Sequence, residues 1–183
     1  SLDGDLKWQE RVGGLFGDDV WPIVGSPVVV GDLVLVGSSD GKLYAFDAVE
    51  GSVEWTFDTD GKIWSTPVVL DGVAYFGSLD HHVYAVRLDD VSEVWRFKTK
   101  GAVAATPAVA DGRVYVGSFD GTFYALDAKT GDVVWRFVGA SNWFWGQALV
   151  VGDIVYVPSL DGNLYALDVD TGRARWAVET EGP

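Results

Sequence analysis

Residues 118–137 read SFDGTFYALDAKTGDVVWRF, and most of the remaining chain consists of copies of this stretch. Shifting the sequence by 40 or 41 residues superimposes Ala45, Ala85, Ala125 and Ala166. A tryptophan follows each alanine ten residues later, at Trp55, Trp95, Trp135 and Trp176. A period of this length is typical of helical solenoids and of propeller blades, so the sequence predicts a single array of repeated units.

The local pattern distinguishes these two architectures. Short runs of β-branched and aromatic residues alternate with Gly-Asp and Asp-Gly pairs, as in residues 26–47. Such runs are typical of β-strands, and the pairs supply the positive φ angles of tight hairpins. The sequence therefore predicts an all-β propeller with four antiparallel strands, here lettered A to D in chain order, in each blade. The four blades are expected at 22–58, 62–98, 102–138 and 143–179.

The expected strand boundaries follow the same repeat. The first blade has strands at 23–30, 33–37, 42–47 and 53–58, and the second at 63–70, 73–77, 82–87 and 93–98. The third has strands at 103–110, 113–117, 122–127 and 133–138, and the fourth at 144–151, 154–157, 163–168 and 174–179.

Residues 1–12 resemble a D strand without its blade, with Trp8 in the tryptophan position. Four blades could close as a small ring, but an open array would expose two apolar blade faces. We expect half of a seven- or eight-bladed ring, completed by missing sequence or by a homodimer of half-propellers that gives eight blades.

Composition excludes several classes of function. The chain has 183 residues and a formal net charge of -14, which disfavours nucleic acids and anionic membranes as partners. It contains no cysteine, and its apolar runs are too short for a transmembrane helix, so we expect no thiolate chemistry and no membrane insertion. No signal peptide is recognised at the N-terminus, and without methionine Ser1 is not a translation start, which indicates a processed or excised chain.

The motif Ala-x-Asp-x-x-Thr-Gly-x-x-x-Trp at 125–135 and 166–176 resembles the tryptophan-docking motif of the pyrroloquinoline-quinone (PQQ) repeat, quinoprotein or BamB-like, β-propellers. In this motif the aspartate binds backbone amides of the C–D turn, the glycine accepts positive φ, and the indole locks one blade against the next. The structural positions are Trp8, Trp55, Trp95, Trp135 and Trp176, with Asp47, Asp127, Asp168, Gly51, Gly131 and Gly172 in the turns.

The family includes quinoprotein alcohol and glucose dehydrogenases, outer-membrane assembly lipoproteins of the BamB type, and sensor domains of bacterial kinases. Its dehydrogenases bind PQQ on the axis of an eight-bladed ring beside calcium, with Glu and Asn ligands, an Asp base and usually a vicinal disulfide. This chain lacks that disulfide and a recognisable Glu and Asn pair. We therefore expect a non-catalytic scaffold without cofactor. The alternative is a fragment of a PQQ- and calcium-dependent oxidoreductase or of a sensor domain. The resemblance favours a periplasmic or secreted location.

Specific function is expected where the copies differ, above all in the D–A loops. Val24, Trp64, Ala104 and Trp145 occupy one equivalent position, and Phe16 and Trp21 lie in the longer first loop. We predict that a partner protein or small ligand binds to aromatic residues at one mouth of the axial channel, namely Trp21, Trp64, Trp143, Phe144 and Trp145. The alternative is that residues of 142–146 only plug the ring or fill a blade interface.

The two histidines, His81 and His82, lie in a B–C loop on the same expected face and are included in the candidate surface. His81 stands where the other copies have glycine, a turn position at which histidine tolerates positive φ. Adjacent side chains on a strand point to opposite faces, so no metal site is expected here. Asp168 and Asp170 superficially resemble a calcium loop, but that loop lacks its bidentate glutamate.

Overall fold

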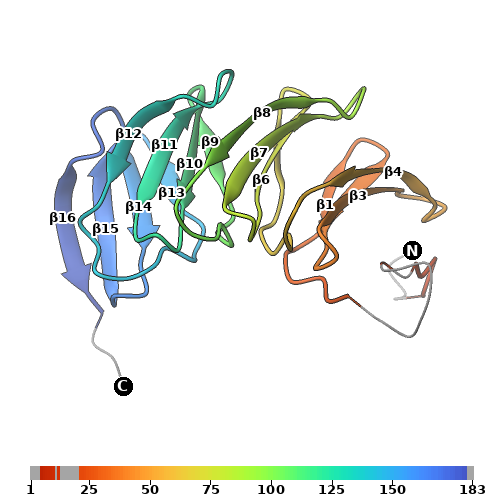
Figure 1. Ribbon diagram of the computed structural model, residues 1–183, viewed down its shortest axis with the longest axis horizontal. Helices are drawn as coiled ribbons and strands as arrows, with labels where there is room; N and C mark the ends of the chain where they lie inside the picture. The colour runs from red at the N-terminus through yellow and green to blue at the C-terminus, as the bar shows by residue number, and fades with distance from the viewer. Residues whose placement is uncertain (1–4, 11, 13–20, 181–183) are drawn as a thin grey trace.

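Four sheets of four antiparallel strands form the computed structural model, which describes residues 5–10, 12 and 21–180. In each sheet the strand order follows the chain, and we call each sheet a blade. The blades lie side by side along an open arc, with the first and fourth at its two ends (Figure 1). The described residues contain no helix, and therefore none that could cross a membrane. The all-β blade architecture predicted from the sequence is confirmed.

The strand bounds are as follows. The first blade contains β1 (Val28–Val30), β2 (Leu33–Gly37), β3 (Lys42–Asp47) and β4 (Val53–Asp58). The second contains β5 (Val68–Leu70), β6 (Val73–Gly77), β7 (His82–Arg87) and β8 (Glu93–Lys98). The third contains β9 (Ala108–Ala110), β10 (Arg113–Gly117), β11 (Phe123–Asp127) and β12 (Val133–Phe137). The fourth contains β13 (Leu149–Val151), β14 (Ile154–Pro158), β15 (Asn163–Asp168) and β16 (Ala174–Glu179).

The innermost strands are shorter than predicted. Each of β1, β5, β9 and β13 has 3 residues, because pairing begins only at the second half of the predicted segment. The amides just before these strands bind the next blade instead: Ser26 N donates to Thr66 Oγ1 over 2.9 Å, and Thr66 N donates to Thr106 Oγ1 over 3.1 Å. A proline without an N–H then precedes three of the strands, at 27, 67 and 107. The twelve other strands agree with the prediction to within one residue.

Apolar cores lie between neighbouring blades. Between the second and third blades, Tyr75, Val83 and Trp95 of one sheet pack against Val114 and Leu126 of the next. All five are buried, and burial of a large apolar side chain contributes about 1.5–3 kcal/mol. We call the side of a blade that faces the following blade its forward face, and the opposite side its back face.

A tryptophan of one blade contacts the C–D turn of the next. The Nε1–H of Trp95 donates to the Ala128 carbonyl over 3.0 Å, and that of Trp135 donates to the Val169 carbonyl over 2.8 Å. The Trp95 ring lies against Gly131, whose φ is 76° and where an added Cβ would lie 2.7 Å from the indole Cδ2. Glycine is therefore required at this turn both by its backbone conformation and by the close approach of the ring.

The segment before the first blade does not form the predicted outer strand in its described part, residues 5–10 and 12. Trp8 nevertheless reaches the C–D turn of the first blade, where its Nε1–H donates to the Ala48 carbonyl over 3.2 Å. Val12 is buried, and both residues pack with Val36, Tyr44 and Phe46 on the back face. Trp8 and Val12 therefore cover part of that face, although none of residues 5–10 and 12 pairs with a sheet.

Replacing Trp95 by alanine should remove a buried indole that belongs to the core between two blades. We expect the free energy of unfolding, measured by chemical denaturation, to fall by about 3–5 kcal/mol. Val134→Ala is the control, because Val134 is 43% exposed on an outer strand, and its loss should stay within about 0.5 kcal/mol. Equal losses in the two variants would contradict this account of blade packing.

Candidate functional site

Four aromatic side chains from three blades form a continuous row at one rim of the arc. The centroids of the Trp64 and Trp145 rings are 6.2 Å apart, and those of Trp145 and Phe119 are 5.2 Å apart. Phe119 and Trp143 stack almost parallel, with centroids 4.7 Å apart and an interplanar angle of 12°. We call Trp64, Trp145, Phe119 and Trp143 the aromatic row. Ring pairs at such distances attract one another beyond simple apolar burial.

The loops hold these rings by specific hydrogen bonds. Trp64 donates from Nε1 to Ser39 Oγ of the preceding blade over 3.1 Å. The amide of Trp143 donates to Asn142 Oδ1 over 2.8 Å, and its carbonyl accepts the Leu160 amide over 2.9 Å. The row therefore rests on both the D–A and the B–C loops, and its rings are positioned before any ligand binds.

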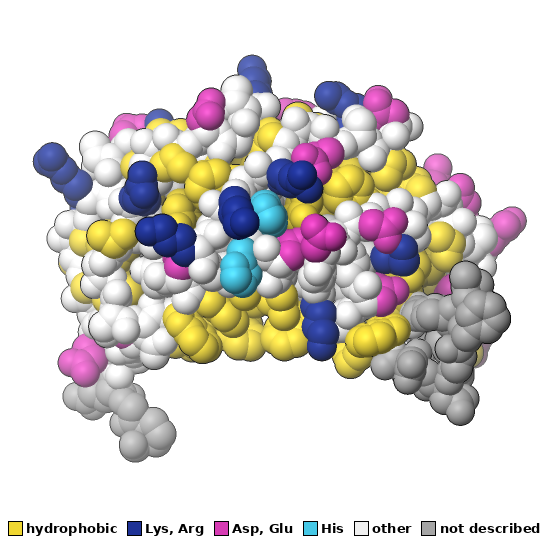
Figure 2. Space-filling model, viewed as in Figure 1, with side chains coloured by type: hydrophobic (Ala, Val, Ile, Leu, Met, Phe, Trp, Pro, Cys, Tyr) yellow, Lys and Arg dark blue, Asp and Glu magenta, His cyan; other side chains and the backbone are white. Residues whose placement is uncertain are grey.

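The row exposes a large part of its apolar surface. Trp143 and Trp145 remain 46% and 44% exposed, although Trp143 stacks on Phe119 and Trp145 contacts the same ring at a tilt. Figure 2 shows hydrophobic side chains gathered along the lower edge of the molecule. Exposed aromatic rings that are already ordered lose little conformational entropy on binding, and such residues often dominate binding energy.

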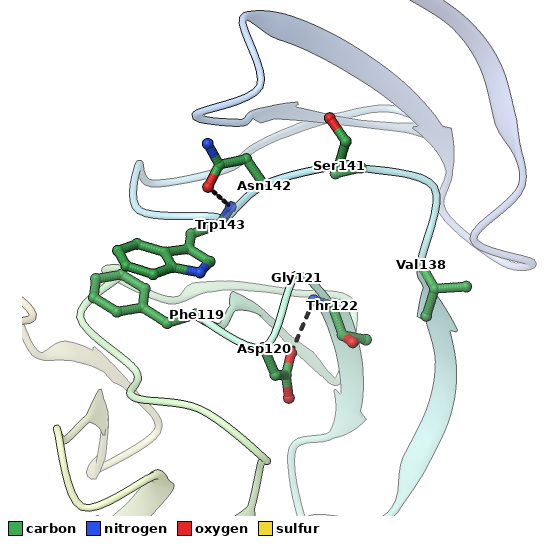
Figure 3. A pocket seen from close by; sticks show the side chains of 9 residues that line it. Phe119, Asp120, Gly121, Thr122, Val138, Ser141, Asn142 and Trp143 are labelled. Carbon is green, nitrogen blue, oxygen red and sulfur yellow. Dashed lines mark hydrogen bonds between the residues drawn. The ribbon is translucent and has the colours of Figure 1, made fainter.

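A cavity of about 350 Å³ adjoins one end of the row, between the B–C loop of the third blade and the D–A loop that leads to the fourth. In Figure 3 the Trp143 ring lies over Phe119 at the side of this cavity, opposite Val138. Thr122, Ser141 and Asn142 add polar groups to the wall. The cavity thus combines aromatic surface with hydrogen-bonding groups, a combination suited to orienting a bound side chain or small molecule.

An aspartate in each B–C loop fixes the rim on which the row stands. In the fourth blade, Asp161 accepts the Tyr165 hydroxyl over 2.7 Å and the amides of Asn163 and Ser141 over 3.0 Å each. Burial opposes ionisation, but these hydrogen bonds lower the pKa of Asp161 to about 2. Equivalent tyrosine-to-aspartate bonds occur in all four blades: Tyr44–Asp40, Tyr84–Asp80, Tyr124–Asp120 and Tyr165–Asp161.

In the third and fourth blades, the pKa of the paired tyrosine shifts upward. Burial and the hydrogen bond to the carboxylate raise the pKa of Tyr124 and of Tyr165 to about 12 each. The four aspartates are therefore engaged in holding the loops. This hydrogen bond was not predicted from the sequence, although a tyrosine follows the aspartate by four residues in every copy.

The predicted aromatic residues separate into three groups. Trp64, Trp143 and Trp145 meet in the row, together with Phe119, which the sequence analysis overlooked. The signal for Phe119 was its position: it is the only aromatic residue directly before the B–C loop aspartate, where the other copies have Ser39, Leu79 and Leu160.

Trp21 makes no ring contact with the aromatic row among the described residues. It is 36% exposed, and the carbonyl of the following Pro22 accepts the amide of Ser39, the residue that also binds Trp64. Phe16 lies outside the described residues.

Phe144 must be removed from the predicted binding surface. Its side chain is 0% exposed and packs with Phe123, Phe137 and Tyr165 in the core between the third and fourth blades. Gly117 allows this position, because an added Cβ there would lie 2.2 Å from Phe144 Cβ. The physical reason is alternation along an extended segment, which turns Phe144 inward between two outward tryptophans.

The histidines occupy a turn of the second blade. His81 has a φ of 75°, as expected for a residue that replaces a turn glycine. His82 Nδ1 lies 3.2 Å from Asp80 Oδ1, and its ring contacts Tyr84. Their participation in ligand binding remains a prediction.

In the part of the chain that the structure describes, the donor groups do not fit the calcium and PQQ that the resemblance to quinoprotein dehydrogenases implies. Among residues 5–10, 12 and 21–180, no three His, Cys, Asp or Glu side chains cluster so that they could hold a metal ion. The loop aspartates are instead hydrogen bonded to tyrosines and amides, as Asp161 illustrates. Calcium prefers six to eight oxygen ligands, which these residues do not assemble.

Comparison with known proteins places these features in a family. A family model described as outer membrane protein assembly factor BamB matches residues 1–95 and 82–183. The structure of BamB from Moraxella catarrhalis is similar, with a TM-score of 0.75 and 24% sequence identity over 88% of this chain and 54% of that chain. This chain thus spans about half the length of the BamB structure. No curated protein sequence matches it.

Two further structures share the fold. Quinohemoprotein alcohol dehydrogenase ADHIIG from Pseudomonas putida HK5 gives a TM-score of 0.77 at 18% identity, over 87% of this chain and 34% of that chain. The computationally designed Ika4 protein gives a TM-score of 0.73 at 19% identity, over 88% of this chain and 99% of that chain. At these identities the likeness concerns the fold alone.

The aspartate tie predicts a specific acid sensitivity. Because the folded-state pKa of Asp161 is about 2 and the unfolded value is about 3.9, its contribution to stability is complete above the unfolded pKa and is lost as the pH falls through about 2. Asp161→Asn should lower the free energy of unfolding at pH 6 and flatten its decline between about pH 4 and pH 2. Urea denaturation at a series of pH values measures both effects.

Asp60→Asn is the matched control, since Asp60 is an exposed residue of a D–A loop. It should leave the pH dependence of the wild-type chain in place. An unchanged acid profile in Asp161→Asn would show that the tie does not contribute to stability.

Proposed function

The chain belongs to the BamB family of PQQ-repeat β-propellers, and from this premise we propose that it is a non-catalytic scaffold that binds a partner protein through the aromatic row. The observation that supports this function best is the series of ring contacts that joins Trp64, Trp145, Phe119 and Trp143 into one partly exposed surface. Repetition accounts for the rest of the fold, whereas this surface depends on residues that differ between the copies.

The shape of the surface favours an extended peptide segment of the partner. The row crosses three blades, and successive centroids are 4.7–6.2 Å apart, so an extended chain can place several side chains against it. The polar cavity at the Trp143 end can accept one further side chain and orient it through Asn142 and Thr122. Aromatic anchors beside a polar pocket are the usual composition of a binding hot spot.

The family is consistent with a role in protein recognition. The matching model is described as an outer membrane protein assembly factor, and such a factor has to recognise other polypeptides. The alternative ligand for the same surface is a small planar molecule stacked on the aromatic row. The cavity between the third and fourth blades supports this alternative.

Trp143→Ala combined with Trp145→Ala should abolish most of the binding without unfolding the chain. Peptides selected from a display library against the wild-type chain should carry aromatic or aliphatic residues at alternate positions and bind the double variant at least about tenfold more weakly. Because both indoles are nearly half exposed, the melting temperature should hardly change. Fluorescence titration and thermal denaturation measure the two quantities.

Val53→Ala provides the control, since Val53 is 46% exposed on the outer strand of the first blade and lies outside the row. It should bind the selected peptides as the wild type does. A large loss of stability in the double tryptophan variant would instead assign these rings to the core.

The oxidoreductase alternative has its own test. Absorbance and calorimetric titration with PQQ in the presence of calcium should give no saturable binding, because the donor groups described above do not assemble a calcium site. Saturable binding of PQQ would overturn the non-catalytic proposal.

A further inference from the structure

The forward face of the fourth blade has the composition of a blade interface but is uncovered. Trp176 of β16 is 41% exposed, whereas its equivalents Trp95 and Trp135 are each 7% exposed. Three aliphatic residues of β13 and β16 extend this apolar surface and are 55–61% exposed: Leu149, Val151 and Val178. In the preceding blades the corresponding face packs on the back face of the next sheet.

The contact that Trp176 lacks is defined by the other copies. Trp8, Trp95 and Trp135 each donate their indole N–H to a carbonyl of the following C–D turn, at 3.2, 3.0 and 2.8 Å respectively. Each ring also lies against the turn glycine, as Trp8 does on Gly51. A blade that covered Trp176 would have to supply a free carbonyl and a bare glycine in the same arrangement.

The first blade carries such a turn on its back face, but Trp8 of the same chain already occupies it. Trp8 takes the Ala48 carbonyl and the Gly51 surface, and the buried Val12 covers the sheet beside it. The segment that contains them is not a strand of any sheet in its described part, residues 5–10 and 12. It therefore makes fewer contacts than a whole blade face would make at the same place.

We propose that Trp176 of one copy and Trp8 of a second copy compete for the C–D turn of the second copy's first blade. When two copies associate, the forward face of the fourth blade of the first copy takes the place of residues 5–10 and 12 of the second copy. The Ala48 carbonyl of the second copy then accepts the Trp176 indole N–H, and its Gly51 receives the ring. We call residues 5–10 and 12 the plug, because through Trp8 and Val12 they occupy this face and limit association.

A second copy is the occupant that the contacts favour. The proposed interface continues the arrangement already present between successive blades, with the same donor, acceptor and glycine. The two uncovered or plugged faces lie at opposite ends of the arc, as Figure 1 shows, so one copy cannot join its own ends without bending. Two copies of four blades also supply a ring of eight, a size within the known range of propellers.

The exchange is favourable because the incoming surface is larger than the plug. The plug contributes the side chains of Trp8 and Val12 to the apolar cluster on the back face. The fourth blade brings Trp176 together with the three aliphatic residues of β13 and β16 and holds them on paired strands. The fourth blade buries more apolar surface than the plug does, which favours association. Its strands are already paired, so less backbone has to become ordered when it binds.

Analytical ultracentrifugation of the full chain and its variants tests the competition. Trp8→Ala should increase the fraction with twice the 19.8 kDa mass and lower the dimer dissociation constant by about tenfold or more. Trp176→Ala should raise the dimer dissociation constant by a similar factor. The double variant Trp8→Ala with Trp176→Ala should be monomeric, because it lacks the indole that enters the vacated site. Val134→Ala, which alters an equally exposed outer-strand residue, should behave as the wild type does.

A peptide of residues 1–12 separates competition from a loss of folding in Trp8→Ala. Added to dimeric Trp8→Ala, the peptide should dissociate it, and the same peptide with alanine at position 8 should not. The proposal is overturned if Trp8→Ala weakens association, if the dimer is insensitive to Trp176→Ala, or if every variant stays monomeric at high concentration. None of these outcomes depends on peptide binding to the aromatic row, which is measured separately.

Discussion

A four-stranded sheet with two apolar faces cannot remain single in water, and this constraint governs the molecule. The second and third blades solve it by placing one face on the preceding sheet and the other on the following sheet, with Trp95 and Trp135 donating hydrogen bonds to the following blade. The indole covers a large area and its N–H needs only one acceptor, so it can close an interface without leaving a buried polar group unsatisfied. An open array of such sheets has two end faces, and their coverage is a separate problem from the packing between blades.

The same constraint leaves the loops free to vary. The sheets and the aspartate ties hold the rim in place, so a loop residue can change without loss of the blade that carries it. Phe119, Trp143 and Trp145 use this freedom to make a stacked surface that no repeated position supplies. Rigid support beneath variable aromatic side chains is a favourable arrangement for recognition, because little entropy remains to be lost on binding.

Much of this fold could be predicted because its signals are local and repeated. The turn glycines and the alternating strands located twelve of the sixteen strands to within a residue. The innermost strands were overestimated because their predicted first halves bind neighbouring blades, as the Ser26 and Thr66 amides do, and that contact has no local signal. Trp143 and Trp145 meet Phe119 in the aromatic row, whereas the inward position of Phe144 depends on the space above Gly117 in another strand, for which the sequence has no local signal.

The two proposed surfaces are compatible because they use different parts of a blade. The aromatic row lies on loops at the rim, whereas Trp176 and Trp8 lie on the flat faces of sheets at the ends of the arc. Association through the end faces would therefore leave both rows uncovered, and rotation about the propeller axis would place them on the same rim. Once a partner with two suitable segments has bound one aromatic row, its second segment would meet the other row at a high effective concentration. The closed ring would therefore bind such a partner more tightly than a single copy does, without any new kind of contact.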